Sequence, residues 1–489
     1  MNRYLSKLVL HLSTFVLLAT ASLAAQAILP AKPVPGEGAA GEWLGALDVG
    51  PTKLRLALHV EKKGDGGLGA ILDSIDQGAK IPVDAVVFER GTLRLALKAI
   101  GASYEGTLNA DGSALQGVWS QGGQELPLTF HRLEKAFALN RPQQPKGPFP
   151  YASREVTFRS GAGNVRLEGT LLLPEGKGPF PAVAFVTGSG PQDRDETLMG
   201  HKPFLVIADA LARRGIASLR WDDRGAGESG GDNMGSTVDD FAADARAAVA
   251  FLRSRPEVDR SAIGIVGHSE GGLIAPMVAV ADKSVAFLVL LAPPGEPIRS
   301  LLMRQARALY RLQGLDQKLI DRALATQAED FELIADPSLT VDRLQEELRA
   351  LAEIRRNRFT VEERARLRVD GDAIERSIRV STTAWFRSLI RQDPAVYLRD
   401  VKIPVLALFG EKDAQVDARV NAEAVRASLT AAGNPDYEVR SLSGLNHLFQ
   451  HAETGSIEEY AAIEETFAPE ALGLVGDWIV ARFQSKKAT

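Results

Sequence analysis

The sequence predicts a small antiparallel β domain followed by a larger α/β domain with a mainly parallel sheet and a helical insertion. Residues 41–133 hold short segments in which apolar and polar residues alternate, separated by glycine and aspartate turns. Residues 151–489 instead alternate apolar runs with helical patterns, which is typical of a parallel sheet covered by helices. A long charged stretch of helical periodicity, residues 297–395, interrupts this alternation, and we expect it to cap the sheet.

In the first domain, apolar and polar residues alternate in "KLRLALHV", "TLRLALKAI" and "LPLTFHRL", and "NADGSA" is typical of a hairpin turn. No cluster of histidine and carboxylate residues in this domain looks catalytic. Residues 134–150 contain "RPQQPKGPFP", whose four prolines predict a linker. We therefore expect residues 41–133 to form a separable unit.

The second domain contains apolar runs that we expect to form its strands: "VRLEGTLLLP", "PAVAFVTGSG", "IASLRWDD", "AIGIVGHS", "VAFLVLLAPP", "PVLALFGEKD" and "YEVRSLSGLNH". In the expected cap, one helical face carries Leu302, Ala306, Leu309 and Leu312.

The composition excludes several classes of protein. The chain has 489 residues and a net charge of −5, without a basic patch long enough to bind nucleic acid. It has no cysteine, so disulfides, thiolate catalysis and thiolate metal sites are excluded.

The N-terminus has the pattern of a secretory signal peptide. Arg3 and Lys7 precede an apolar run, residues 8–25, that ends in the small-x-small site Ala25-Gln26-Ala27. We expect cleavage after residues 1–27, a periplasmic or secreted protein, and no stable membrane insertion after cleavage. The alternative is a membrane anchor, which the short and interrupted run disfavours.

The stretch "AIGIVGHSEGG", residues 262–272, places a serine on a sharp turn. The apolar run stops at Gly267, Ser269 lies between glycines, and a helix-like stretch follows. This is the G-x-S-x-G form of a nucleophile elbow, in which a strained strand-to-helix turn exposes the serine hydroxyl. Ser269 is therefore our candidate nucleophile.

A serine nucleophile needs a base, an orienting acid and hydrogen-bond donors for the oxyanion. With this type of elbow, the acid and the base follow the serine along the chain, which leaves His447 and His451 as bases. We favour His447, because it lies on the loop just past the last strand. For the acid we favour Asp413, which lies shortly after an apolar strand, over Glu411 and Asp417.

We expect the oxyanion donors to be the backbone N–H groups of Glu270 and Ser189. Glu270 directly follows the serine, and Ser189 lies in "TGSGPQDRD", where glycines let the backbone approach a substrate. The alternative is that this second loop is only a tight turn. In the cap, "TTAWFRSL" supplies Trp385 and Phe386, which we expect to form an aromatic wall that binds substrate and limits acyl length; the alternative is that they are core residues of the hinge.

These motifs support a resemblance to a known family. Residues 151–485 resemble the α/β-hydrolase superfamily in GHSEGG, TGSGP, DDRGAGES, GEKDAQV and LNHLFQ. With "SIDQG", "GVWSQGG" and "WFRSLIRQDP", the chain is similar to bacterial carboxylesterases that carry a β-rich N-terminal domain. The resemblance implies hydrolysis of short-chain esters without a metal or cofactor. The chain departs at Thr187, where many relatives have histidine, which puts the side-chain contacts of that loop in question.

The sequence therefore predicts a serine carboxylesterase that acts on a small-molecule ester through an acyl-enzyme on Ser269, with His447 as base and Asp413 as orienting acid. Two alternatives stay open. One is an exopeptidase on the same scaffold, which would need a carboxylate in the cap for the α-amino group of the substrate. The other is a cell-wall or glycan-binding protein with a vestigial hydrolase domain.

Overall fold

The structure is a computed structural model, and it describes residue 36 and residues 38–48, 53–64, 66–77, 79–367, 369 and 371–484. The predicted signal peptide, residues 1–27, lies outside the described residues, so cleavage and export stay predictions. Among the helices that the structure describes, none combines the length and the apolar content that a membrane crossing requires.

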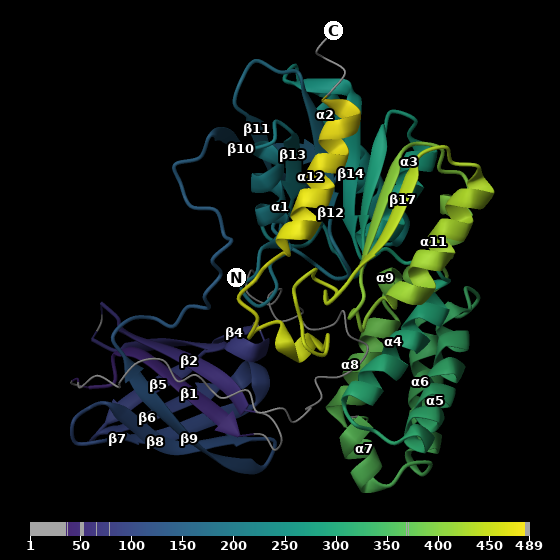
Figure 1. The fold of residues 1–489 in the computed structure, drawn as a ribbon. Helices are drawn as coiled ribbons and strands as arrows, with labels where there is room; N and C mark the ends of the chain where they lie inside the picture. Colours follow the sequence, from purple (N-terminus) through teal and green to yellow (C-terminus); the bar gives the residue numbers. More distant parts are fainter. Residues whose placement is uncertain are drawn as a thin grey trace.

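The first domain is a nine-stranded antiparallel sheet that curves into a half-barrel, with the strand order β4-β3-β2-β1-β9-β8-β7-β6-β5 (Figure 1). Alternate residues of its strands point inward, as the alternating sequence pattern requires. Trp43, Tyr104 and Phe130 are among the fully buried side chains of its core. Its elements are β1 (Gly41–Asp48), β2 (Lys53–Lys62), β3 (Leu68–Ser74), η2 (Ile75–Gln77), β4 (Ala79–Pro82), β5 (Ala85–Glu89), β6 (Thr92–Leu97), η3 (Lys98–Ile100), β7 (Ala102–Leu108), β8 (Ala114–Gln121) and β9 (Gln124–Leu133).

The second domain is built on an eight-stranded sheet with the order β10-β11-β13-β12-β14-β15-β16-β17. β10, β11 and β13 pair antiparallel, and all the later pairs are parallel. The strand patterns did not predict β10, because most of its residues are polar and exposed. The strands are β10 (Tyr151–Arg159), β11 (Arg166–Pro174), β12 (Phe180–Val186), β13 (Ala217–Trp221), β14 (Val258–His268), β15 (Phe287–Leu291), β16 (Val405–Gly410) and β17 (Tyr437–Leu442).

Helices cover both faces of this sheet, and each face has its own apolar core. α1 (Pro203–Ala212) and α12 (Pro469–Phe483) pack on one face. α2 (Val238–Ser254), α3 (Glu270–Ala281) and α11 (Ala418–Ala432) pack on the other. Because both faces are covered, β12, β15 and β16 are continuously apolar rather than alternating.

The cap is a helical bundle inserted between β15 and β16, and Figure 1 shows it in green below the sheet. Its base joins the core of the sheet, while its outer helices have a small core of their own. The sheet, the cap and the preceding β domain confirm the predicted fold class. The cap helices are α4 (Ile298–Leu312), α5 (Gln317–Ala335), α6 (Val341–Arg356), α7 (Val361–Leu367), α8 (Asp372–Ser381), α9 (Ala384–Leu389) and α10 (Pro394–Leu398).

Candidate active site

Ser269 lies on the turn between β14, which ends at His268, and α3, which begins at Glu270. Its backbone is strained, with φ 53° and ψ −115°. The flanking glycines make this turn possible: a Cβ atom on Gly267 would lie 2.2 Å from the carbonyl oxygen of Gly271, and one on Gly271 would lie 2.2 Å from that of Val186. The serine is therefore held on the sharp turn that the sequence predicts.

His447 and Asp413 form a buried pair on two neighbouring loops. His447 lies past β17 and Asp413 past β16, and His447 Nδ1 is 2.7 Å from Asp413 Oδ2. The other carboxylate oxygen, Oδ1, accepts hydrogen bonds from the backbone amides of Gln415 (2.7 Å) and Val416 (2.8 Å). The carboxylate is thus fixed in position and can orient the imidazole.

The competing residues lie elsewhere. The side chain of His451 is 56% exposed, and its two ring nitrogens contact Glu465 and Glu470. Asp417 caps the N-terminus of α11 by accepting a hydrogen bond from Val420 N, and Glu411 is exposed.

The side chain of His268, the last residue of β14, is buried. Its Nδ1 lies 2.9 Å from Glu196 Oε1, and its Nε2 lies 3.0 Å from the carbonyl oxygen of His447. Burial lowers the pKa of His268, but the Glu196 carboxylate and the His447 carbonyl raise it more, so the net pKa lies above the ordinary value. His268 therefore ties the loop of the candidate base to the end of β14.

Glu196 is a site residue that no sequence motif reveals. It adopts a left-handed conformation, with φ 54°, and is buried. Besides contacting His268, its Oε1 accepts a hydrogen bond of 2.7 Å from the backbone amide of Gly188. One carboxylate thus fixes the loop after β12 to the end of β14, although nothing in its local sequence distinguishes it from the other acids of that loop.

The loop after β12 carries Ser189, and the side chain of Thr187 anchors this loop. The Thr187 hydroxyl donates to both carboxylate oxygens of Asp223, at 2.8 Å, which holds the loop against the turn after β13. Ser189 and Glu270, the two predicted oxyanion residues, border the same cavity as Ser269.

The side chain of Glu270 is buried, with the residue 3% exposed, and it joins three parts of the protein. Both its oxygens accept a hydrogen bond from Trp385 Nε1 at 3.1 Å, and the Ser189 hydroxyl also donates to it. Burial raises the pKa of Glu270 to about 7, and the two hydrogen bonds oppose that shift. Glu270 thus connects α3, the loop after β12 and the cap.

Trp385 and Phe386 do not line the cavity. Trp385 (3% exposed) contacts Glu270, and Phe386 (2% exposed) packs against Phe331 of α5. Both belong to the apolar core at the base of the cap. The structure therefore replaces the predicted aromatic wall with the alternative that these are core residues.

A cavity of about 650 Å³ extends from Ser269 and His447 into the cap. This volume is in the range of pockets that enclose a drug-sized ligand. Much of its cap wall is apolar, including Leu301, Leu302, Ile334, Leu348 and Ile374. Within the residues that the structure describes, no group of three or more histidine, aspartate or glutamate side chains is placed to hold a metal ion.

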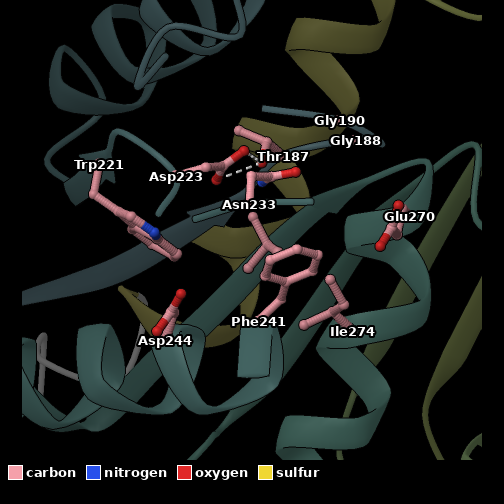
Figure 2. A pocket seen from close by; sticks show the side chains of 11 residues that line it. Thr187, Gly188, Gly190, Trp221, Asp223, Asn233, Phe241, Asp244, Glu270 and Ile274 are labelled. Carbon is pink, nitrogen blue, oxygen red and sulfur yellow. Dashed lines mark hydrogen bonds between the residues drawn. The ribbon is translucent and has the colours of Figure 1, made fainter. Parts of the chain in front are cut away.

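A second cavity of about 20 Å³ lies between the loops after β12 and β13 and the start of α3. Figure 2 shows the Thr187–Asp223 hydrogen bonds on one side of it and Ile274 and Phe241 on another. It is too small for any ligand larger than a water molecule. Of these two cavities, only the large one can therefore receive a substrate, and Glu270 borders both.

The sheet, the elbow serine and the buried aspartate–histidine pair define a serine hydrolase of the α/β-hydrolase class. Residues 202–453, just over half of the chain, match the family model Hydrolase_4, described as serine aminopeptidase, S33, and the chain belongs to this family.

The chain is similar to named esterases. It is 29% identical to esterase EstD of Thermotoga maritima over 301 residues, which cover 62% of this chain and 61% of EstD, less than two thirds of that relative. It is 31% identical to acyl-coenzyme A thioesterase 1 of Mus musculus over 140 residues, covering 28% and 29% of the two chains. Among solved structures, Pyrococcus furiosus esterase Pf2001 matches with a TM-score of 0.42 and 17% identity, covering 72% of this chain and 99% of that one.

We expect replacement of Gly271 by alanine to destabilise the elbow, because the added methyl group would collide with the Val186 carbonyl. The free energy of unfolding, measured in urea, should fall by about 1–3 kcal/mol. The control is Gly473→Ala in α12, where nothing lies within 4 Å of the added Cβ atom and alanine should add up to about 1 kcal/mol. Equal stability of Gly271→Ala and wild type would contradict this account of the turn.

We expect Glu270→Gln to change how stability depends on pH. A carboxyl whose pKa is raised from 4.5 to about 7 contributes stability below pH 4.5 that is lost as the pH rises through 7. Glutamine does not titrate, so the variant does not lose this stability. The unfolding free energy of the variant minus that of wild type should therefore increase between pH 5 and pH 8, by up to about 3 kcal/mol. Denaturant titrations at both pH values test this, with the exposed Glu411→Gln as control; a difference independent of pH would show that Glu270 is not buried as described.

Proposed function

We propose that the protein is a serine esterase that hydrolyses carboxylic esters through an acyl-enzyme on Ser269. The observation that carries the proposal is the buried Asp413–His447 pair, whose histidine lines the same cavity as Ser269 on its strained turn. A histidine held by a fixed carboxylate is the arrangement that activates a serine hydroxyl.

In the proposed reaction, Ser269 Oγ attacks the ester carbonyl while His447 Nε2 takes the hydroxyl proton. The amides of Glu270 and Ser189 stabilise the negative oxygen of the tetrahedral intermediate. The carbon–oxygen bond to the alcohol then breaks, and His447 gives its proton to the leaving alkoxide. Water repeats the two steps on the acyl-enzyme, which releases the acid and restores the serine.

The cavity favours an ester over a peptide with a free amino terminus. An exopeptidase of this type needs a carboxylate for the α-amino group. The described cavity lining has three carboxylates, and each already has partners within the protein: Glu196 with Gly188 and His268, Glu270 with Trp385, and Asp330 with Arg355. The similarity to esterase EstD supports the same choice. Nitrophenyl acetate should therefore be turned over much faster than aminoacyl-nitroanilides.

Replacement of the proposed catalytic residues tests the function directly. Ser269→Ala and His447→Ala should fold normally and lose esterase activity by a factor on the order of 10⁴ or more, and Asp413→Asn should lose less, because the base remains but is poorly oriented. His451→Ala is the matched control and should keep its activity, since its ring contacts only surface glutamates. A fluorophosphonate should label wild type on Ser269.

The opposite result for the two histidines, loss with His451→Ala and none with His447→Ala, would contradict the proposed base. Failure of the fluorophosphonate to label wild type would instead favour a vestigial hydrolase domain.

We propose that the enzyme accepts the short acyl chains that the resemblance implies and also longer ones, because the cavity of about 650 Å³ continues into the cap. Ala352 on α6 lines this cavity, whereas Ala350 on the same helix is exposed and does not. Ala352→Phe should lower kcat/KM for nitrophenyl octanoate about tenfold and leave the acetate within about twofold, while Ala350→Phe changes neither. An equal effect of Ala352→Phe on both esters would mean that the acyl chain does not enter the cap.

A further inference from the structure

Arg141 lies in the segment between β9 and β10, where the sequence predicts a linker, and it is buried, with 8% of the residue exposed. Its Nη1 donates a hydrogen bond of 2.8 Å to the carbonyl oxygen of Ile463. Its Nη2 donates to the carbonyl oxygens of Met199 (2.8 Å) and Ala461 (3.1 Å). One guanidinium therefore holds two loops that are far apart in the sequence.

The neighbouring glutamines bind the same two loops. Gln143 Oε1 accepts from the amides of Thr466 and Phe467, and its Nε2 donates to the carbonyl oxygen of Phe467 at 2.7 Å. Gln144 Nε2 donates to the carbonyl oxygen of Gly200 at 2.7 Å. Residues 141–144 are thus docked on the hydrolase domain by side-chain to backbone hydrogen bonds.

The two loops form one wall of the substrate cavity. Leu198 and Met199 line the cavity from the first loop, and Ile457 and Tyr460 line it from the second. These side chains belong to a small apolar cluster that also contains Leu448, the residue after His447. The position of this wall therefore depends on the hydrogen bonds that residues 141–144 make to the two loops.

His201 joins the two loops as well, but without charge. Its Nε2 lies 2.8 Å from the carbonyl oxygen of Tyr460, and its Nδ1 lies 3.0 Å from Thr466 Oγ1. Burial, together with the positive charge of Arg141, lowers the pKa of His201 to about 4, so it is neutral at ordinary pH. Burial lowers the pKa of Arg141 to about 10, so Arg141 is still charged at neutral pH and supplies the charged donors behind this wall.

The catalytic acid is held separately. Asp413 accepts from the backbone amides of its own loop, and Gln415 Nε2 in that loop donates a hydrogen bond of 3.1 Å to Tyr460 Oη of the wall. Displacement of the wall should therefore change how a substrate is bound more than how the acid orients His447.

We propose that Arg141 is a positioning residue of the substrate cavity, so that the segment between the two domains sets the shape of the wall formed by residues 198–199 and 457–460. The inference rests on the proposed esterase function. It differs from the separable unit that the proline-rich sequence predicts, because the segment contributes to the site through the contacts of Arg141, Gln143 and Gln144.

Kinetics of the full-length Arg141→Ala variant test the proposal. KM for nitrophenyl octanoate should rise about tenfold, because a small displacement of a positioning group has large effects, while kcat for the acetate stays within about threefold. Arg154→Ala is the matched control: it removes an arginine from β10 whose partner is the surface residue Glu257, and both constants should stay unchanged. Millimolar methylguanidinium should restore the octanoate KM of Arg141→Ala and leave wild type and Arg154→Ala unaffected.

Wild-type KM for octanoate in a folded Arg141→Ala variant would overturn the proposal, as would a raised KM that methylguanidinium does not restore. If the variant does not fold, Gln144→Ala decides: KM should rise about threefold, and an unchanged KM overturns the inference. A wild type inactive on both esters would contradict the proposed function instead. Limited proteolysis would then decide this inference: Arg141→Ala should be cut faster than wild type within residues 452–466, and equal rates would overturn it.

Discussion

The site depends on one close contact between backbones, the approach of helix α3 to the end of strand β12. A single methyl group on Gly271 would lie 2.2 Å from the carbonyl oxygen of Val186, so only glycine allows the two elements to meet. This contact puts the elbow of Ser269 beside the loop that carries Ser189, and the proposed nucleophile and oxyanion donors become neighbours. The fixed carboxylate of Asp413 and the loops around the cavity can serve the proposed reaction only if Ser269 is held beside this loop.

The parts of the protein that the sequence predicts best are those that a short stretch encodes by itself. The glycines around Ser269 dictate their own backbone, and continuous apolar runs mark strands that are buried on both faces. The choice between His447 and His451 needed only the position of each relative to the last strand. The pair formed by His447 and Asp413 agrees with that choice, although the catalytic roles stay proposals.

The sequence does not reveal contacts between residues that are far apart in the chain. Trp385 and Glu270 are separated by 115 positions, and Arg141 and Ala461 by 320. Nothing near Trp385 indicates that its indole faces a buried carboxylate rather than a substrate. The segment around Arg141 has no helix or strand, but its prolines do not indicate that its side chains are docked, because the loops that they contact are distant in the sequence.

The cap enters and leaves the sheet at one place, between β15 and β16, whereas the serine, the aspartate and the histidine come from loops that follow other strands. Natural variation can therefore lengthen, shorten or repack α4–α8 without moving the proposed catalytic groups. The Trp385–Glu270 hydrogen bond is one limit on that freedom, because it fastens the base of the cap to α3. Homologues with this architecture can therefore diverge in the compounds they accept while keeping the same chemistry.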